Sequence, residues 1–324
     1  GSGAAIEVPE MKYAIPSNVT AFDSDGDGFE DRVYVGDTVG QVWRVDLVGV
    51  NPASVLAPEG DSVVGILANI STPGTLTKER RFFYRPSVVQ VIDTVYSDAA
   101  NGEYDYVLIG TGNRANPLDT EVADRFYAFR DITIGTMADA DSNNIADDYP
   151  LNTDKSSVGV PIADDGSTLI DISTTVLDAS AAGVQSALGW FFDFATATAG
   201  RDGEKVLAAS SVFARTLVFT TYVPDDPAAV SDPCQAAEGT GVAYNLNILS
   251  TAAALDWDED GTLEPTDDRA AELGTGIPSE AVPIFTEEGV TVLVGTGGGA
   301  ENLGKVSELP RFNTYWYEDG GDDD

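Results

Sequence analysis

The stretch DSDGDGFEDRVYVGDTVGQVWRVDL, residues 23–47, joins an acidic loop to two β-rich runs. The runs RVYVG and QVWRVDL stand on either side of a glycine-bounded turn at residues 37–40, which is the pattern of a β-hairpin. Before them, residues 23–31 alternate carboxylates with glycines. The stretch therefore predicts a loop of converging carboxylates that leads directly into a hairpin.

The acidic loop has the spacing of a calcium site. Positions one, three, five and nine carry carboxylates and position seven offers a main-chain carbonyl, from Asp23, Asp25, Asp27, Asp31 and Phe29. Gly28 at the sharp sixth position lets the backbone turn around an ion. An EF-hand carries a bidentate Glu at position twelve, where this chain has Tyr34, so Asp31 would bind directly. The alternative is a solvated acidic turn.

Two later stretches repeat this spacing. DWDEDGTLEPTD, residues 256–267, offers ligands at positions one, three, five, seven, nine and twelve, which are Asp256, Asp258, Asp260, Thr262, Glu264 and Asp267. DADSNNIAD, residues 139–147, offers Asp139, Asp141, Asn143, Ile145 and Asp147. Asn144 replaces the sixth-position glycine there, and Asn tolerates the left-handed backbone conformation. Both sets rest on spacing alone, and ordinary acidic turns are the alternative.

The charge of the chain restricts its partners. With 17 basic and 54 acidic residues among 324, the formal net charge is −37, which argues against nucleic acid or an anionic membrane as a partner. Such a charge opposes compaction unless divalent cations or salt offset it, which agrees with calcium loops and an extracellular location. No apolar run approaches the roughly 20 residues of a membrane helix, so no membrane span is expected.

The absence of histidine excludes several chemistries. With no His in the chain, His-based proton transfer, His-ligated zinc and haem attachment are ruled out. Cys234 is the single cysteine, so it has no partner for an internal disulfide and no His base that would make it a nucleophile. The composition favours a binding protein over an enzyme.

The hairpin plan recurs along the chain and predicts an all-β fold. Further strand pairs or strands are expected at residues 105–131, 203–224, 239–249 and 289–299, with additional strands at 86–93 and 189–194. The run at 203–224 is expected to form two strands, and residues 177–188 a short helix or a crossing. Trp43 and Trp190 are expected in the core.

Radially repeated sheets would make a modified β-propeller, complete or partial, spanning residues 1–317. Long insertions at about 112–124, 133–185 and 224–238 interrupt its spacing, so another β architecture such as a sandwich remains the alternative. Residues 318–324 are expected to be a disordered acidic tail.

The stretch at 23–47 resembles the calcium loop and following blade of the C-terminal domain of PilY-type proteins, the tip adhesins and biogenesis factors of bacterial type IV pili. Later segments are similar to the same family in the same order. They are GNR at 112–114, LGWFFDF at 188–194, GEKVLAASSV at 203–212, LVFTTYVP at 217–224, DPC at 232–234 followed by GTGVAYNLN at 239–247, and TYWYED at 314–319. The resemblance covers residues 13–318.

The resemblance implies that Asp23, Asp25, Asp27, the Phe29 carbonyl and Asp31 bind the family's Ca²⁺ ion. It also implies an extracellular protein at the pilus tip that supports pilus assembly, balances extension against retraction and mediates attachment. Its partners would be minor pilins or the tip complex, a host or abiotic surface, or an upstream segment of the same protein. The family's N-terminal adhesion module is not part of this sequence, so adhesion through that module is not implied.

Two other functions remain open from the residues. A quinone-cofactor dehydrogenase would also be a propeller that uses Ca²⁺ and an Asp base, although no cofactor pocket can be identified in the sequence. A carbohydrate-binding propeller would use exposed aromatic side chains, for which Tyr315, Trp316 and Tyr317 are candidates.

Overall fold

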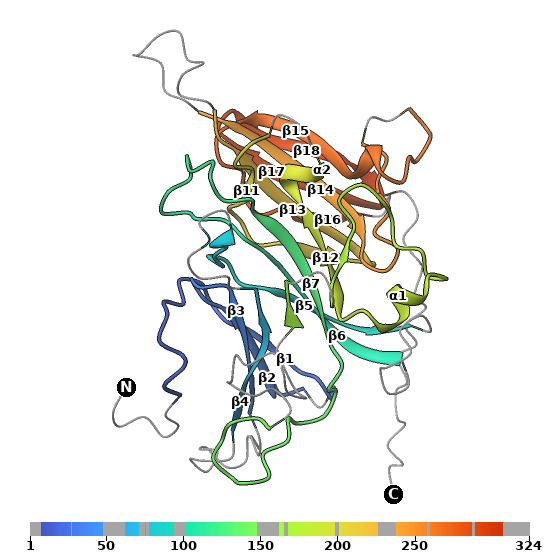
Figure 1. Ribbon diagram of the computed structural model, residues 1–324. Coiled ribbons are helices and arrows are strands. Elements are labelled where there is room, and N and C mark those ends of the chain that lie inside the picture. The colour runs from blue at the N-terminus through green and yellow to red at the C-terminus, as the bar shows by residue number, and fades with distance from the viewer. Residues whose placement is uncertain are drawn as a thin grey trace, which may run out of the picture.

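The computed structural model shown in Figure 1 describes residues 8–26, 28–47, 62–70, 75, 78–93, 102–147, 162–164, 168–197, 201–225, 238–257, 260–286 and 289–306. Several residues that the sequence analysis singled out lie outside these ranges. They are Asp27, Asp258, Cys234, the aromatic residues 315–317 and the acidic tail at 318–324.

The described residues form an all-β structure, as predicted, with four sheets. The first sheet has the order β1 (Thr20–Phe22), β2 (Arg32–Gly36), β3 (Gln41–Asp46), β4 (Val63–Asn69) and β8 (Ile162–Ala163). The second has the order β5 (Ser87–Ile92), β6 (Glu103–Gly110), β7 (Arg125–Asp131), β10 (Gly189–Asp193) and β9 (Ile170–Asp171). Neighbouring strands are antiparallel except at the edges, where β8 runs parallel to β4 and β9 parallel to β10.

The third sheet has the order β11 (Lys205–Val206), β13 (Thr216–Val223), β14 (Thr240–Asn247) and β15 (Ala270–Thr275), with β12 (Ser211–Phe213) also paired to β13. The fourth has the order β16 (Val282–Thr286), β17 (Gly289–Thr296) and β18 (Gly299–Val306). The helices are α1 (Ala182–Ser186), α2 (Phe194–Ala197) and the 3-10 helix η3 (Asp267–Arg269). Within the described ranges, no helix has the length and apolar character needed to cross a membrane.

Most sequence expectations for the strands are confirmed. The hairpin of the opening stretch is β2 and β3, the run at 105–131 gives β6 and β7, and α1 lies inside 177–188. The run at 203–224 forms three strands where two were expected. Its extra turn joins β12 to β13 through Ala214 and Arg215, which both have positive φ, at 46° and 65°. Residues other than glycine seldom adopt this conformation, so the sequence carried no turn signal there.

The four sheets pack face to face in chain order. The first sheet lies at the bottom of Figure 1, and the third and fourth sheets overlap at its top. Tyr34 and Phe129 belong to the apolar cluster between the first and second sheets. Phe126 of β7 stacks on Phe219 of β13 between the second and third, with ring centroids 4.1 Å apart. Because both faces of the central sheets are covered, their strands read as continuous apolar runs. Trp43 and Trp190 are fully buried, as predicted.

Glycines at the ends of two strands allow the sheets to approach closely. A Cβ added at Gly36 would lie 2.5 Å from the Cβ of Phe82, and one at Gly110 would lie 2.3 Å from the Cγ2 of Val206. In the structure each one is the last residue of a strand and makes room for a segment that packs on it.

One hydroxyl contact repeats from sheet to sheet along the row of inner strands β1, β5, β12 and β16, which lie side by side. The first residue of β1, β5 and β12 donates its hydroxyl to the carbonyl that directly precedes the next inner strand. The pairs are Thr20 to Pro86 at 2.5 Å, Ser87 to Ser210 at 2.7 Å and Ser211 to Ala281 at 2.6 Å. Among the described residues the row has two ends, at β1 and β16, and no sheet closes on itself.

Two arginines of the first hairpin lie buried between the first and second sheets. Arg44 of β3 is fully buried and pairs with Asp131 at 2.9 Å and with Asp46 at 2.8 Å. Arg32 of β2 pairs with Asp105, which is also fully buried. Burial is the largest single influence and would lower the pKa of Arg44, but Asp131, Tyr34 and Asp46 together outweigh it and raise the pKa, so the guanidinium stays charged.

The same guanidinium groups hold the start of the long insertion that follows β7. Arg44 donates hydrogen bonds to the carbonyls of Thr133 and Gly135, each at 2.7 Å. Arg32 donates to the Gly135 carbonyl at 3.1 Å. The first hairpin, the second sheet and the insertion are therefore joined through two side chains.

We expect Arg44→Met to lower the free energy of unfolding by about 3–5 kcal/mol, because it removes the arginine paired with the buried Asp131 and leaves Asp46 with only its longer contact to Arg32, at 3.4 Å. Urea unfolding followed by tryptophan fluorescence measures the effect. The matched control is Arg81→Met, since Arg81 pairs with Glu79 at 3.8 Å and its side chain is 40% exposed, and its expected cost is below about 1 kcal/mol. Equal stabilities of the two variants would contradict the importance of the buried pair.

Candidate metal centre

The acidic loop that opened the sequence analysis connects β1 to β2. Asp23 follows the last residue of β1, and Asp31 directly precedes β2. One carboxylate oxygen from each of Asp23, Asp25 and Asp31 lies within 4.8 Å of the others. Ca²⁺ binds oxygen at roughly 2.3–2.6 Å, so two ligands of one ion are at most about 5 Å apart. The three carboxylates therefore fit a calcium ion in both chemistry and spacing.

Hydrogen bonds inside the loop shape it around these carboxylates. The Asp23 carboxylate accepts the main-chain N–H of Gly26 at 2.7 Å and of Gly28 at 2.8 Å. Asp31 accepts the N–H of Ser24 at 3.0 Å and its hydroxyl at 2.8 Å. Gly26 and Gly28 have φ of 78° and 91°, a left-handed conformation that glycine adopts without strain. The glycines of the motif therefore supply the sharp turn that the spacing predicted.

The loop is attached to the two sheets on either side of it. The main-chain N–H of Leu47, just after β3, donates to the Asp31 carbonyl at 2.7 Å. The Gln90 side chain of β5 donates to the Ser24 carbonyl at 3.2 Å. Arg32, the next residue after Asp31, enters the buried ionic cluster. The conformation of the loop therefore depends on how the first and second sheets pack against each other.

The loop at residues 139–147 has a similar internal arrangement. The Asp139 carboxylate accepts the N–H of Asn144, at 2.9 Å, which corresponds to the bond from Gly28 to Asp23. Asp147 accepts the N–H of Ala140 at 2.7 Å, as Asp31 does from Ser24. Asn144 has a φ of 65°, so it takes the left-handed role predicted for it. The Ile145 N–H binds the Asn143 side-chain carbonyl at 2.8 Å.

This second loop lies along the outer strand of the first sheet. The Val64 N–H of β4 donates to the Asn144 carbonyl at 3.0 Å, and the Ala146 N–H donates to the Val64 carbonyl at 2.9 Å. Asp141 belongs to the same exposed turn, where it accepts the Asn143 side-chain amide at 3.0 Å. The loop therefore extends the sheet in addition to presenting its acidic residues.

The loop at residues 256–267 also has a hydrogen bond from its sixth residue to the carboxylate of its first residue. The Gly261 N–H donates to Asp256 at 3.0 Å. Its turn continues with the Thr262 N–H bound to Asp260 at 2.7 Å. The other Asp256 oxygen is shielded from solvent and has no hydrogen-bond partner among the described residues. An oxygen of this kind is what a cation would satisfy.

Acidic side chains and Trp257 line a hollow of about 430 Å³ beside this third loop. They include Asp260, Glu264 and Asp267, the last of which begins η3. Partial desolvation, followed by the nearby charges of Asp260 and Asp268, raises the pKa of Glu264. Trp257 is partly buried and packs against the apolar cluster of the third and fourth sheets.

The three loops differ in how closely their carboxylates meet. Within the described ranges, the acidic side chains of the first loop are the one group of three whose ligand atoms come within 4.8 Å of one another. Metal binding by each loop stays a prediction, and the first loop has the most favourable geometry.

A buried carboxylate outside the loops was not singled out by the sequence. Asp124 is 2% exposed and accepts the Thr111 hydroxyl at 2.7 Å, while its second oxygen has no hydrogen-bond partner among the described residues. Burial raises the pKa of Asp124 to about 6, although Thr111 and the charges of Lys205 and Arg80 act in the opposite direction. Its signal in the sequence, one Asp before the strand β7, is indistinguishable from that of the many other acids.

Asp124 should make the protein less stable as the pH rises. The folded protein holds this proton up to about pH 6, whereas the unfolded chain releases it near 3.8, so the stabilisation present below pH 3.8 is lost as the pH rises through 6. The shift of about two units corresponds to on the order of 3 kcal/mol. We expect Asp124→Asn to reduce the fall in unfolding free energy between pH 4 and pH 7 by this order. The exposed Asp202→Asn is the control, and parallel pH profiles for wild type and Asp124→Asn would contradict the assignment.

The row of antiparallel sheets and the acidic loop ahead of β2 define an all-β domain with a candidate calcium loop. This architecture is similar to the crystal structure of the Pseudomonas aeruginosa PilY1 C-terminal domain, with a TM-score of 0.56 and 16% identity over 90% of this chain and 61% of that chain. In sequence, the chain is 24% identical over 250 residues to a protein named Type IV pilus biogenesis factor PilY1 homolog from Xylella fastidiosa (strain Temecula1). That match spans 76% of this chain and 15% of the relative's length.

No family model matches the chain. The predicted resemblance to the C-terminal domain of PilY-type proteins is nevertheless confirmed, because the sequence relative and the solved structure are both PilY1 proteins.

Proposed function

We propose that this chain is a calcium-binding, non-enzymatic module of a type IV pilus protein, located outside the cell at the pilus tip or on the outer surface. The observation that carries the proposal is the convergence of Asp23, Asp25 and Asp31 in a fold shared with a PilY1 C-terminal domain. The name of the sequence relative supports a role in pilus biogenesis. The proposed activities are support of pilus assembly, balance of extension and retraction, and surface attachment.

The role of the metal would be structural. A bound Ca²⁺ ion supplies positive charge that offsets the mutual repulsion of the loop carboxylates. Asp23 and Asp31 would hold it from the two ends of the loop, and Asp25 from its exposed turn. Because Asp31 is followed by Arg32 of the buried ionic cluster, an ordered loop would keep β2 in its place against the second sheet.

We further propose that the four sheets are part of a modified β-propeller. The hydroxyl contact that repeats between successive inner strands supports radial repetition. At the open end of the row, β16 exposes three large apolar side chains, since Val282, Ile284 and Phe285 are 54%, 41% and 62% exposed. An upstream segment of the same protein, or a minor pilin of the tip complex, would cover this strand.

Added Ca²⁺ should raise the melting temperature of the purified chain in 150 mM NaCl, and a chelator should lower it. Binding to the folded form alone contributes about 2.7 kcal/mol when the free ion is at a hundredfold over its dissociation constant. We expect Asp25→Asn to bind one Ca²⁺ fewer by native mass spectrometry and to show a smaller thermal shift. Asp25 is exposed, so its loss should leave the apo fold intact.

The control variant is Asp202→Asn, an exposed acid far from the loops in sequence, which should keep the full ion count and the full shift. Mg²⁺ at the same concentration separates site binding from general charge screening, because it prefers smaller octahedral sites. Identical melting curves in Ca²⁺, Mg²⁺ and chelator would overturn the proposal.

Two other functions have distinct readouts. A quinone-dependent dehydrogenase would reduce a dye when the quinone and Ca²⁺ are added, and we expect no turnover. A carbohydrate-binding propeller would give hits on a glycan array that disappear when residues 315–317 are replaced by alanine. These aromatic residues lie outside the described ranges, so this second function rests on the sequence alone.

A further inference from the structure

A pocket of about 940 Å³ lies where the segments that precede all four inner strands meet. These segments are residues 16–18 before β1, 83–85 before β5, 207–209 before β12 and 277–280 before β16. The pocket therefore opens at the N-terminal ends of the inner strands, and every sheet contributes to its wall. A concave site of this size accommodates a small molecule or a few residues of peptide.

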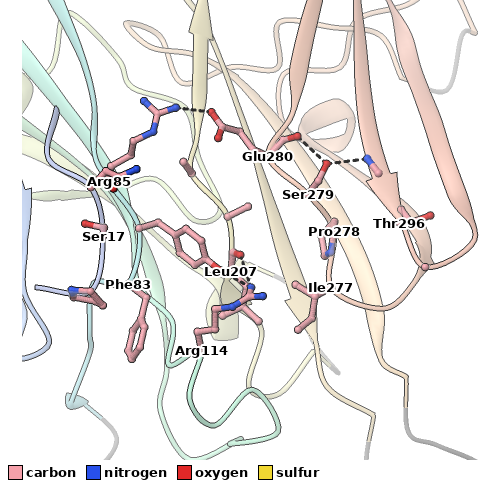
Figure 2. Close-up of a pocket in the computed structure, with 17 residues that line it drawn as sticks. Ser17, Phe83, Arg85, Arg114, Leu207, Ile277, Pro278, Ser279, Glu280 and Thr296 are labelled. Atoms are coloured by element: carbon pink, nitrogen blue, oxygen red, sulfur yellow. Dashed lines mark hydrogen bonds and ion pairs between the residues drawn. The ribbon is translucent and has the colours of Figure 1, made fainter. Parts of the chain in front are cut away.

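The pocket carries an excess of positive charge. Figure 2 shows Arg85 paired with Glu280 in one part of the pocket, at 2.9 Å, and Arg114 in another part, between Phe83 and Ile277 in this view. Arg114 donates to the Tyr84 hydroxyl and to the Leu207 carbonyl, and no carboxylate lies within ion-pair distance of it among the described residues. The charged residues that line the pocket are Arg85, Arg114 and Glu280, so its lining is net positive although the whole chain carries −37.

The surroundings of Arg114 hold its guanidinium in place. The group lies over the Tyr84 ring, 5.8 Å from the centroid, and is also bound to the Leu207 carbonyl at 3.3 Å. These contacts involve one guanidinium nitrogen, Nη1, which leaves the remaining N–H groups of the planar fork for a ligand. An arginine fixed in this way is suited to bind a carboxylate through two hydrogen bonds.

Other lining groups indicate what the carboxylate is attached to. Phe83, Leu207, Ile277 and Pro278 give the wall an apolar part, which a free inorganic anion would not use. A peptide with an acidic and an apolar side chain matches this combination of an arginine and an apolar wall better than a simple acid does.

We propose that this pocket binds a short peptide segment that presents a carboxylate next to an apolar side chain, with Arg114 pairing with the carboxylate. Nucleic acid and other polyanions do not fit, because the remainder of this strongly acidic chain repels them. A single carboxylate carries little charge and gains its binding from the local guanidinium and the apolar wall. The pocket shares no residue with the three acidic loops.

The probe is the peptide acetyl-Phe-Glu-amide, titrated into the full chain in 150 mM NaCl and 2 mM CaCl2 and followed by NMR of the arginine side chains and by calorimetry. We expect saturable binding with a shift of the Arg114 signal. The neutral analogue acetyl-Phe-Gln-amide should bind at least about tenfold more weakly, because it lacks the charge. Sodium acetate and inorganic phosphate test whether an anion without an apolar group is sufficient.

Arg114→Gln should weaken binding of the Glu peptide about tenfold and leave the Gln peptide unaffected. The matched control is Arg215→Gln, an exposed arginine in the turn between β12 and β13, which should bind like wild type. Circular dichroism and melting temperature confirm that both variants fold. The proposal is overturned if no peptide binds at millimolar concentration, if both peptides bind equally, if acetate or phosphate competes as well as the Glu peptide, or if Arg114→Gln binds like wild type.

Discussion

The pairing of Arg44 and Arg32 with buried carboxylates is the constraint on which the N-terminal half of the structure depends. Charges removed from water need counter-charges in a defined geometry, and here Asp131 and Asp105 of the second sheet provide them for the first hairpin. This requirement fixes how the two sheets face each other. It also fixes where the long insertion starts, because the same side chains bind the carbonyl groups that follow β7. The acidic loop is attached to this rigid interface through Asp31.

Beyond that interface two local features recur between neighbouring sheets, a hydrogen bond between inner strands and a glycine at a strand end. A hydroxyl at the first position of an inner strand binds the carbonyl before the next one, from Thr20 to Ser87 to Ser211. Glycines at strand ends, such as Gly36 and Gly110, remove the side chain that would keep neighbouring segments apart. Each of these features is local. Together they bring the segments before the four inner strands to one place, where the pocket lies.

The sequence predicted the features that depend on neighbouring residues. Alternation and glycine spacing indicated the hairpin of β2 and β3, apolar runs indicated the buried strands, and the acid and glycine pattern indicated the loop geometry of residues 23–31. It also predicted the left-handed Asn144. In each case the physical cause acts within about ten residues of the chain.

The sequence could not predict features that join distant residues. Arg44 and Asp131 are 87 positions apart, and a chain with 54 acids offers many equivalent partners for any arginine. The pocket around Arg114 draws on segments from every sheet, so no single stretch carries its signature. The extra turn at Ala214 and Arg215 was missed because neither residue type favours positive φ, and the antiparallel pairing of β12 with β13 overrides their preference.

The face-to-face succession of sheets has a mechanical consequence. Because the apolar clusters of the described residues connect each sheet to its neighbours in chain order, tension applied to the two ends of this module would pass through the interfaces in series. The weakest interface then sets the load at which the module yields, and sheets could detach one after another while the rest stay folded.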